Sequence, residues 1–197
     1  MFEALTERFP ELHKIGDHYA AYWHRMEVPA GTALLREGDI ARKIFIIEKG
    51  CVRAWMNNEG REITFEFIFE GAVAVASESF RKEVPAFFNL QAIEPAVLYW
   101  IHKGDWEKMT HDLEDIPGMT HYGTEVLLER QYTYLRKFIS MLNETPQQRY
   151  INLLQQDPRV VRRVPLRHIA TYLGITPVSL SRIRKRVGEH RETLPLP

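Results

Sequence analysis

The chain of 197 residues has a single cysteine, Cys51, and no long hydrophobic run. A lone cysteine excludes an internal disulfide framework, a zinc site made of several cysteines, and an iron–sulfur cluster held by four thiolates. No stretch approaches the roughly 18 apolar residues of a membrane span. The first residues also lack the basic flank and apolar segment of a secretory signal. The sequence therefore predicts a cytoplasmic protein that does not contact a membrane.

Histidine is also missing where a metal-dependent enzyme would need it. Residues 26–101 contain no histidine, whereas a cupin-like enzyme needs clustered histidine and glutamate on neighbouring strands. His102, His111 and His121 are nine and ten residues apart, so they do not share one helical face. We expect no catalytic residues, no metal and no cofactor.

Charge is balanced overall but unevenly distributed. The chain has 26 basic and 26 acidic residues. From Thr145 onward there are ten lysines and arginines and three acidic residues, a net charge of +7, which leaves −7 before it. A basic C-terminal segment attracts phosphate, so a nucleic-acid partner is compatible with the neutral total.

The first half of the chain has the pattern of a β-barrel. Apolar residues at helical spacing up to about Trp23 predict a helical cap. Short runs of alternating residues, separated by glycines, then begin near Met26. Residues 63–69 alternate between the two faces of a strand, and residues 57–60 have the composition of a hairpin turn. Many short strands at regular spacing predict a jelly-roll barrel with an internal pocket.

A helical period returns after the barrel and extends from about residue 115 to residue 142. The dimerisation residues that we expect along one stripe are Gly123, Leu127, Tyr134, Phe138 and Met141. A long helix with one apolar stripe commonly pairs with its twin, so we expect a homodimer. The alternative is that the stripe packs only on its own barrel, because Arg130 interrupts it.

Residues 165–186 have the pattern of two short helices joined by a tight turn. Ile169 and Leu173 lie four apart on the first helix, and Gly174 allows a sharp turn. Thr176-Pro177 then provides an N-cap and a proline at the first helical position. This combination predicts a helix-turn-helix whose second helix reads DNA.

The exposed side of that second helix has the side chains that suit the major groove, where serine and arginine bond to base edges. The candidate DNA-binding residues are Thr176, Pro177, Val178, Ser179, Ser181, Arg182, Lys185 and Arg186. The alternative is an ordinary helical hairpin whose charges are solvated. A double-stranded DNA partner explains the combined spacing better.

The order of barrel, long helix and helix-turn-helix resembles the Crp/Fnr family of bacterial transcription regulators over nearly the whole chain. The segments that carry the resemblance are 29–31, 36–39 and 44–50 in the barrel and 169–184 in the helix-turn-helix. The resemblance implies that Ser181 and Arg182 meet bases or the adjacent phosphates. It also makes RNA polymerase a candidate partner.

One departure from the family concerns the effector. Members that bind cyclic nucleotides hold the phosphate with a Gly-Glu pair and a later Arg-Ser/Thr-Ala run, whereas this chain has Val75-Ala76 and residues 86–88 at those places. Arg81 and Lys82 could replace the charge only if the loop were shifted. The candidate effector-pocket residues are Ser77, Glu78, Ser79, Phe80 and Phe87. We therefore expect an effector that is apolar or uncharged rather than cyclic AMP.

These observations predict an α+β protein with three parts. We expect a barrel sensor with its helical cap over 1–114, a dimerisation helix over 115–144 and a helix-turn-helix domain over 145–197 that resembles a winged helix with a reduced or absent wing. The expected function is a DNA-binding transcription regulator that binds a roughly palindromic operator as a homodimer. The alternative is a signalling module that binds a small molecule and acts through protein partners.

Overall fold

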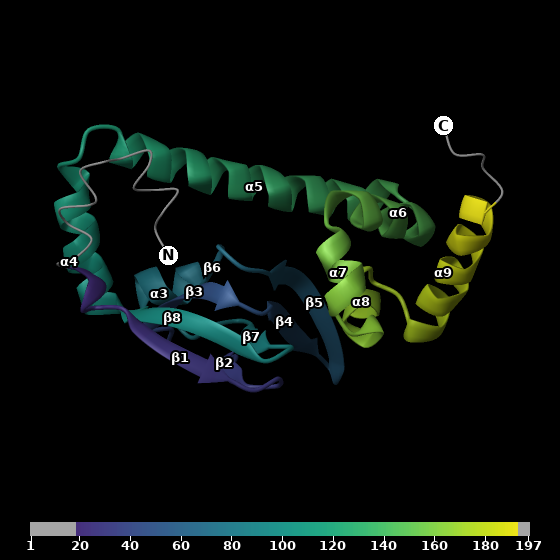
Figure 1. Cartoon of the computed structure of the whole chain (residues 1–197), viewed down its shortest axis with the longest axis horizontal. Helices are drawn as coiled ribbons and strands as arrows, with labels where there is room; N and C mark the ends of the chain where they lie inside the picture. Colours follow the sequence, from purple (N-terminus) through teal and green to yellow (C-terminus); the bar gives the residue numbers. More distant parts are fainter. Residues whose placement is uncertain (1–18, 193–197) are drawn as a thin grey trace. The chain divides into compact units, whose positions relative to one another are not determined.

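The computed structural model describes residues 19–192. These residues, whose helices and strands are labelled in Figure 1, form two compact units. The first unit holds residues 19–56 and Phe67–Arg130, and the second holds Asn57–Glu66 and residues 131–192. The units divide the chain differently from the three expected domains, because the tip of a barrel hairpin joins the helical unit and the long helix spans both. The expected helical cap lies largely outside the described residues.

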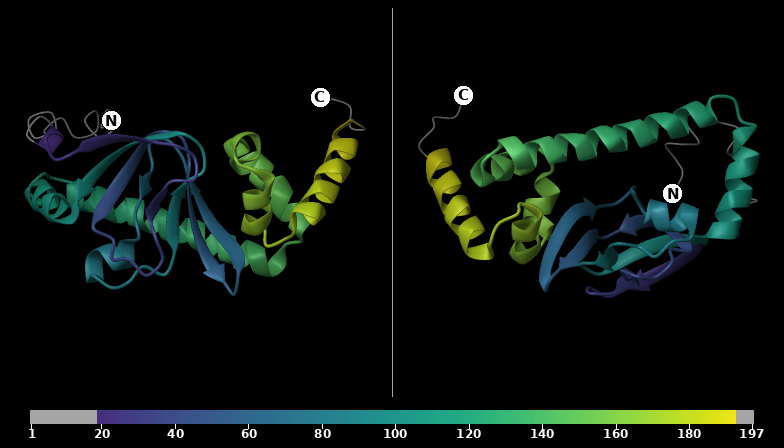
Figure 2. Two further views of the ribbon diagram at one scale, coloured as in Figure 1. Left: turned by 90° about the horizontal axis from the view of Figure 1, so that it is seen from below. Right: turned by 180° about the vertical axis from the view of Figure 1, so that it is seen from behind.

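Eight strands form the barrel in two antiparallel sheets, which Figure 2 shows from two further directions. The strands are β1 His24–Val28, β2 Ala33–Leu35, β3 Lys43–Lys49, β4 Val52–Asn58, β5 Arg61–Ile68, β6 Val73–Ala74, β7 Asn89–Ala92 and β8 Ala96–His102. One sheet has the order β1-β8-β3-β6 and the other β2-β7-β4-β5. The jelly-roll prediction and the α+β class are confirmed.

Alternating apolar residues fill the space between the sheets. On β4, Val52 and Ala54 lie opposite Ala92 and Leu90 of β7, and all four side chains are buried. On β3, Ile47 lies opposite Leu98 of β8, and both are buried. These positions follow the two-residue period of a strand with one face in a core.

The β4–β5 hairpin closes with a tight turn. Glu59 and Gly60 have φ values of 52° and 83°. Two consecutive positive φ values are typical of the type I′ turn, whose twist matches that of the paired strands. The Asn57 side chain accepts a hydrogen bond from the Gly60 N–H at 3.0 Å. The hairpin turn that the sequence predicts at residues 57–60 is therefore present in the structure.

Helices follow and interrupt the strands. They are α3 Ser77–Lys82, α4 Lys103–Glu114, α5 Met119–Asn143, α6 Pro146–Gln156, α7 Pro158–Arg163, α8 Leu166–Tyr172 and α9 Pro177–Glu192. The long helix starts four residues later than expected, and the sequence also predicts a short helical piece before it, where the structure has α4.

The basic composition of residues 159–163 predicts a link between helices, and the structure corrects this prediction because the segment belongs to helix α7. Asp157 accepts a hydrogen bond from the Arg159 N–H, Pro158 occupies the first turn, and Val160 is buried. These are the signals of a helix start, and the basic residues had concealed them.

Candidate nucleic-acid interface

Helices α8 and α9, the predicted helix-turn-helix, are joined by a short turn and pack around a small apolar core. Ile169 and Ala170 of α8 and Leu180 of α9 have no exposed surface, and Leu173 and Ile183 are also buried. Ala170 presents only a methyl group, which allows the two helices to approach closely. The spacing found in the sequence therefore produces the predicted packing.

The turn between these helices is stabilised by local hydrogen bonds. Gly174 has a φ of 70°, in the left-handed region that favours glycine. The N–H of Ile175 donates to the Ala170 carbonyl at 3.0 Å. The Thr176 hydroxyl then accepts from the Ser179 N–H at 3.2 Å and caps α9.

Most of the expected DNA-binding side chains lie on the side of α9 away from this core. The exposed ones are Thr176, Pro177, Val178, Ser181, Arg182, Lys185 and Arg186. Ser179 differs, because it is half-buried and its hydroxyl lies 3.0 Å from that of Thr176. A hydroxyl engaged in the cap is less available to a base, so Ser181 and Arg182 are the stronger candidates for base contacts.

Arg149 connects the helix-turn-helix to the end of the long helix. Its guanidinium donates to the Glu144 carbonyl at 2.8 Å, to the Leu173 carbonyl at 2.9 Å, and to the Met141 carbonyl at 3.4 Å. These carbonyls belong to helix ends, which lack partners of their own. The sequence analysis missed this role, because nothing in the local pattern distinguishes Arg149 from a solvated arginine.

Helix α5 exposes many large apolar side chains. They are Val126, Leu127, Leu128, Tyr132, Leu135, Phe138, Ile139, Met141 and Leu142, with Leu127 63% and Phe138 62% exposed. Three of the five expected dimerisation residues belong to this set, and Gly123 is exposed beside it. Tyr134 does not belong, because it is half-buried and its hydroxyl donates to Glu66 of β5 at 2.9 Å.

The expected effector-pocket residues do not line one common cavity, because some are buried in the core and others face solvent. Ser79 is buried and its hydroxyl accepts from the Ala41 N–H at 2.9 Å, and Phe80 lies in the core. Ser77 and Glu78 face solvent, and Phe87 is 55% exposed with its ring against Phe88. None of the five lines either of the two cavities described below.

The residues at α3 do not fit a cyclic phosphate. Ala76 at the N-cap makes no side-chain hydrogen bond, and the first turn carries the carboxylate of Glu78. An acidic group there opposes an anion. Arg81 and Lys82 lie in the last turn, and Lys82 is paired with Glu78 at 2.8 Å. The basic side chains of α3 therefore lie at its C-terminal end and not in its first turn.

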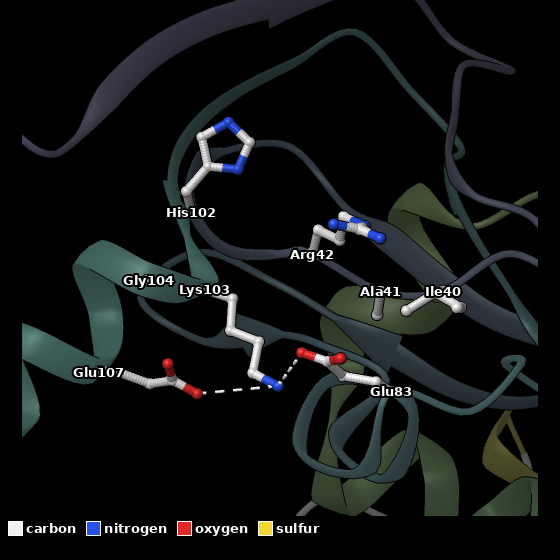
Figure 3. Close-up of a pocket in the computed structure, with 8 residues that line it drawn as sticks. All are labelled: Ile40, Ala41, Arg42, Glu83, His102, Lys103, Gly104 and Glu107. Carbon is white, nitrogen blue, oxygen red and sulfur yellow. Dashed lines mark hydrogen bonds and ion pairs between the residues drawn. The ribbon is translucent and has the colours of Figure 1, made fainter.

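Two cavities lie beside the loop before β3. One, of about 320 Å³, is lined by Arg42, Glu83, His102, Lys103 and Glu107 among others (Figure 3). In it, Lys103 bridges Glu83 at 2.8 Å and Glu107 at 3.7 Å. The hydrogen bond from Lys103 lowers the pKa of Glu83 and raises the pKa of Lys103 itself.

The other cavity, of about 570 Å³, has a mixed polar and apolar lining. It is lined by Leu34, Leu35, Ile40, Phe45 and Leu90, with Asp39, Arg42 and Lys43 among its polar residues.

Residues 19–192 were searched for metal-binding clusters and for helices that could span a membrane. No group of three or more histidine, cysteine, aspartate or glutamate side chains is placed to hold a metal ion. None of the helices described there has the length and hydropathy to cross a membrane.

The barrel matches a family model, that of the cyclic nucleotide-binding domain, over residues 25–112. A search of the curated proteins finds no match.

Several solved structures share the fold of nearly the whole chain. The c-di-GMP responsive global regulator CLP of Xanthomonas campestris aligns with a TM-score of 0.71 and 17% identity, covering 88% of this chain and 90% of that chain. FixK2 of Bradyrhizobium japonicum gives a TM-score of 0.72 and 15% identity, with 85% of each chain covered. A transcriptional regulator of the Crp/Fnr family from Eubacterium rectale gives 0.67 and 17%, covering 91% of this chain and 84% of that one. Residues 25–112 thus match the cyclic nucleotide-binding domain, and the chain shares the fold of these solved transcription regulators.

Proposed function

We propose that this protein is a sequence-specific DNA-binding transcription regulator of the Crp/Fnr type. The observation that carries the proposal is the exposed side of α9, where Val178, Ser181, Arg182 and Lys185 surround one line of the helix opposite its buried residues. Arginine can fork onto guanine, and valine can touch a thymine methyl group. The net charge of +7 from Thr145 onward supplies the attraction to phosphate.

We further propose that the protein acts as a homodimer through α5. The apolar side chains on this helix would be costly to leave in water, and contiguous patches of this kind mark interfaces. A second copy of the same helix is the simplest cover, because two-fold symmetry matches each stripe with itself. Two copies of α9 would then read two half-sites of a roughly palindromic operator.

Analytical ultracentrifugation tests the dimer. Phe138→Asp places a charge in the apolar stripe and is expected to shift the sedimentation coefficient to that of a monomer. Val178→Asp is the matched control, since Val178 is 61% exposed on α9, outside the stripe. A Phe138→Asp protein that sediments like the parent chain contradicts the proposed interface.

Selection from a pool of random duplexes tests the DNA function. We expect the full chain to enrich a sequence with two-fold symmetry. Arg182→Ala should then weaken binding to that sequence by about 1–3 kcal/mol, with little change for random duplex. Arg184→Ala, an exposed change on the flank of the same helix, should weaken all duplexes alike. Equal losses on selected and random DNA for Arg182→Ala contradict base reading by this residue.

The barrel is proposed to bind an effector other than a cyclic nucleotide. The position of Glu78 and the absence of a basic side chain in the first turn of α3 argue against a cyclic phosphate. Repeating the duplex selection with and without a metabolite extract tests whether a small molecule changes binding. Cyclic AMP added alone should leave the binding curve unchanged. RNA polymerase is a further proposed partner, and co-purification on operator DNA tests it.

A further inference from the structure

The outer strand of the β4–β5 hairpin contacts the first helix of the helix-turn-helix. The hydroxyl oxygens of Thr64 on β5 and Thr171 on α8 share a hydrogen bond at 2.9 Å. One turn earlier on α8, Nδ1 of His168 lies 3.9 Å from the carboxylate of Glu62. We call these four residues the hairpin contact.

The long helix completes the contact from a third direction. The Lys137 ammonium group of α5 donates to the Phe65 carbonyl of β5 at 3.1 Å and lies 4.7 Å from the centre of the Tyr172 ring on α8. Lys137 thus joins the same strand to the same helix. Strand β5 is at the edge of its sheet, with β4 as its neighbour on one side.

Burial distinguishes the hairpin contact from a chance surface encounter. Thr64 is 2% exposed and His168 is 5% exposed. Polar groups buried to this extent are costly unless they are bonded. Thr64 and His168 are the polar residues at the centre of the contact, and each faces a partner from a segment about a hundred residues away.

Helix α8 packs through buried apolar residues against the helix that carries the proposed reading side chains. Ile169, Ala170 and Leu180 leave no exposed surface between α8 and α9. Whatever holds α8 in place therefore also holds α9, while Ser181 and Arg182 stay exposed. The hairpin contact leaves the reading side of α9 uncovered.

We propose that the hairpin contact positions the reading helix, so that Glu62 and Thr64 of β5 are positioning residues for DNA recognition. The inference rests on the proposed function. Strand β4 of the same hairpin pairs with β7 of the barrel from Val52 to Trp55. A shift of these strands therefore reaches α8 through the hairpin, by a route separate from the connection between α5 and α6.

The consequence for DNA binding is selectivity for half-site spacing. A dimer whose reading helices are held firmly accepts one spacing, because the two helices must enter successive major grooves about 34 Å apart. A dimer with loosely held reading helices accepts neighbouring spacings as well. Loss of the hairpin contact should thus change the choice among duplexes more than it changes the stability of the fold.

A disulfide test examines the contact without DNA. Two hydroxyls 2.9 Å apart place the thiols of Thr64→Cys and Thr171→Cys within reach of a bond. We expect the double variant to cross-link under mild oxidation. Ile63→Cys with Thr171→Cys is the control, because Ile63 points to the opposite face of the strand. Cys51 is fully buried and does not compete. Equal cross-linking of the two pairs, or none in the first, overturns the contact.

A spacing series then tests the positioning role. The two variants compared are Thr64→Val with Thr171→Val, which removes both hydroxyls at constant shape, and Thr64→Ser with Thr171→Ser, which keeps them. The discrimination measured is between the selected operator and an operator whose half-site spacing differs by one base pair. We expect this discrimination to fall about three- to tenfold in the valine pair, which corresponds to the loss of one hydrogen bond. The serine pair and the oxidised cysteine pair should discriminate like the parent chain.

Two results overturn the positioning role. One is a valine pair that discriminates as well as the parent chain, and the other is an oxidised cysteine pair that no longer binds the operator. A parent chain that selects no duplex at all removes the proposed function and the positioning role together. The cross-link in that case still reports the contact, so the two failures are distinguishable.

Discussion

Replacing Arg149 with methionine should uncouple the helix-turn-helix from the end of α5. The guanidinium makes two short bonds, to the Glu144 carbonyl at 2.8 Å and the Leu173 carbonyl at 2.9 Å, and a longer one to Met141 at 3.4 Å. Hydrogen bonds to charged groups contribute about 1.5–3 kcal/mol each. Because Arg149 is half-exposed, we expect Arg149→Met to lower the free energy of unfolding by about 2–4 kcal/mol, most of it from the two short bonds.

Urea unfolding followed by far-ultraviolet circular dichroism measures this loss. Arg159→Met is the matched control, because Arg159 pairs with Asp157 at the surface at 2.9 Å and such pairs contribute at most about 1 kcal/mol. Arg149→Lys should recover only part of the loss, since an ammonium group cannot fork between two carbonyls. A change of less than about 1 kcal/mol for Arg149→Met would refute the reasoning, because the carbonyls would then have other partners.

Three further predictions concern stability. Leu180→Ala leaves a cavity at a fully buried position and should cost about 2–5 kcal/mol in urea unfolding, and a cost as small as that of an exposed residue contradicts the packing. The hydrogen bond to Asp112, with burial, raises the pKa of Tyr19 to about 12, so its stabilisation is complete below pH 10 and lost as the pH rises through 12. Tyr19→Phe should be less stable than the parent below pH 10 and equal to it above pH 12. Lys103 lowers the pKa of Glu83 below 4.5, so this stabilisation holds above that pH and is lost on acidification through the lowered pKa. Glu83→Gln should lack this acid-dependent loss, and an unchanged acid profile contradicts the bridge.

Much of the helix-turn-helix could be predicted because its signals are local. Gly174, Thr176-Pro177 and the apolar pair Leu180 and Ile183 each act within a few residues of their place in the sequence. The structure gives each of them its predicted role in the turn, the cap or the core. Backbone propensity and helical period therefore carried this part of the prediction.

The long helix was predicted only in part. The period of the sequence gave a helix with an apolar stripe, but Tyr134 was placed on that stripe and instead bonds to Glu66. Val126, Leu135 and Leu142 were not singled out although they are exposed on the same helix as Leu127. Spacing along the sequence does not show which side chains of the stripe contact another element, because that depends on what packs beside the helix.

The sequence alone determined the barrel, the long helix and the two helices joined by the turn at Gly174, because each depends on which residues stand close together along the chain. The tertiary structure decided which distant residues meet. Thr64 and Thr171 are 107 positions apart, and Arg149 reaches carbonyls before and after it in the sequence. Such contacts arise when whole elements pack, and no short stretch of residues specifies them.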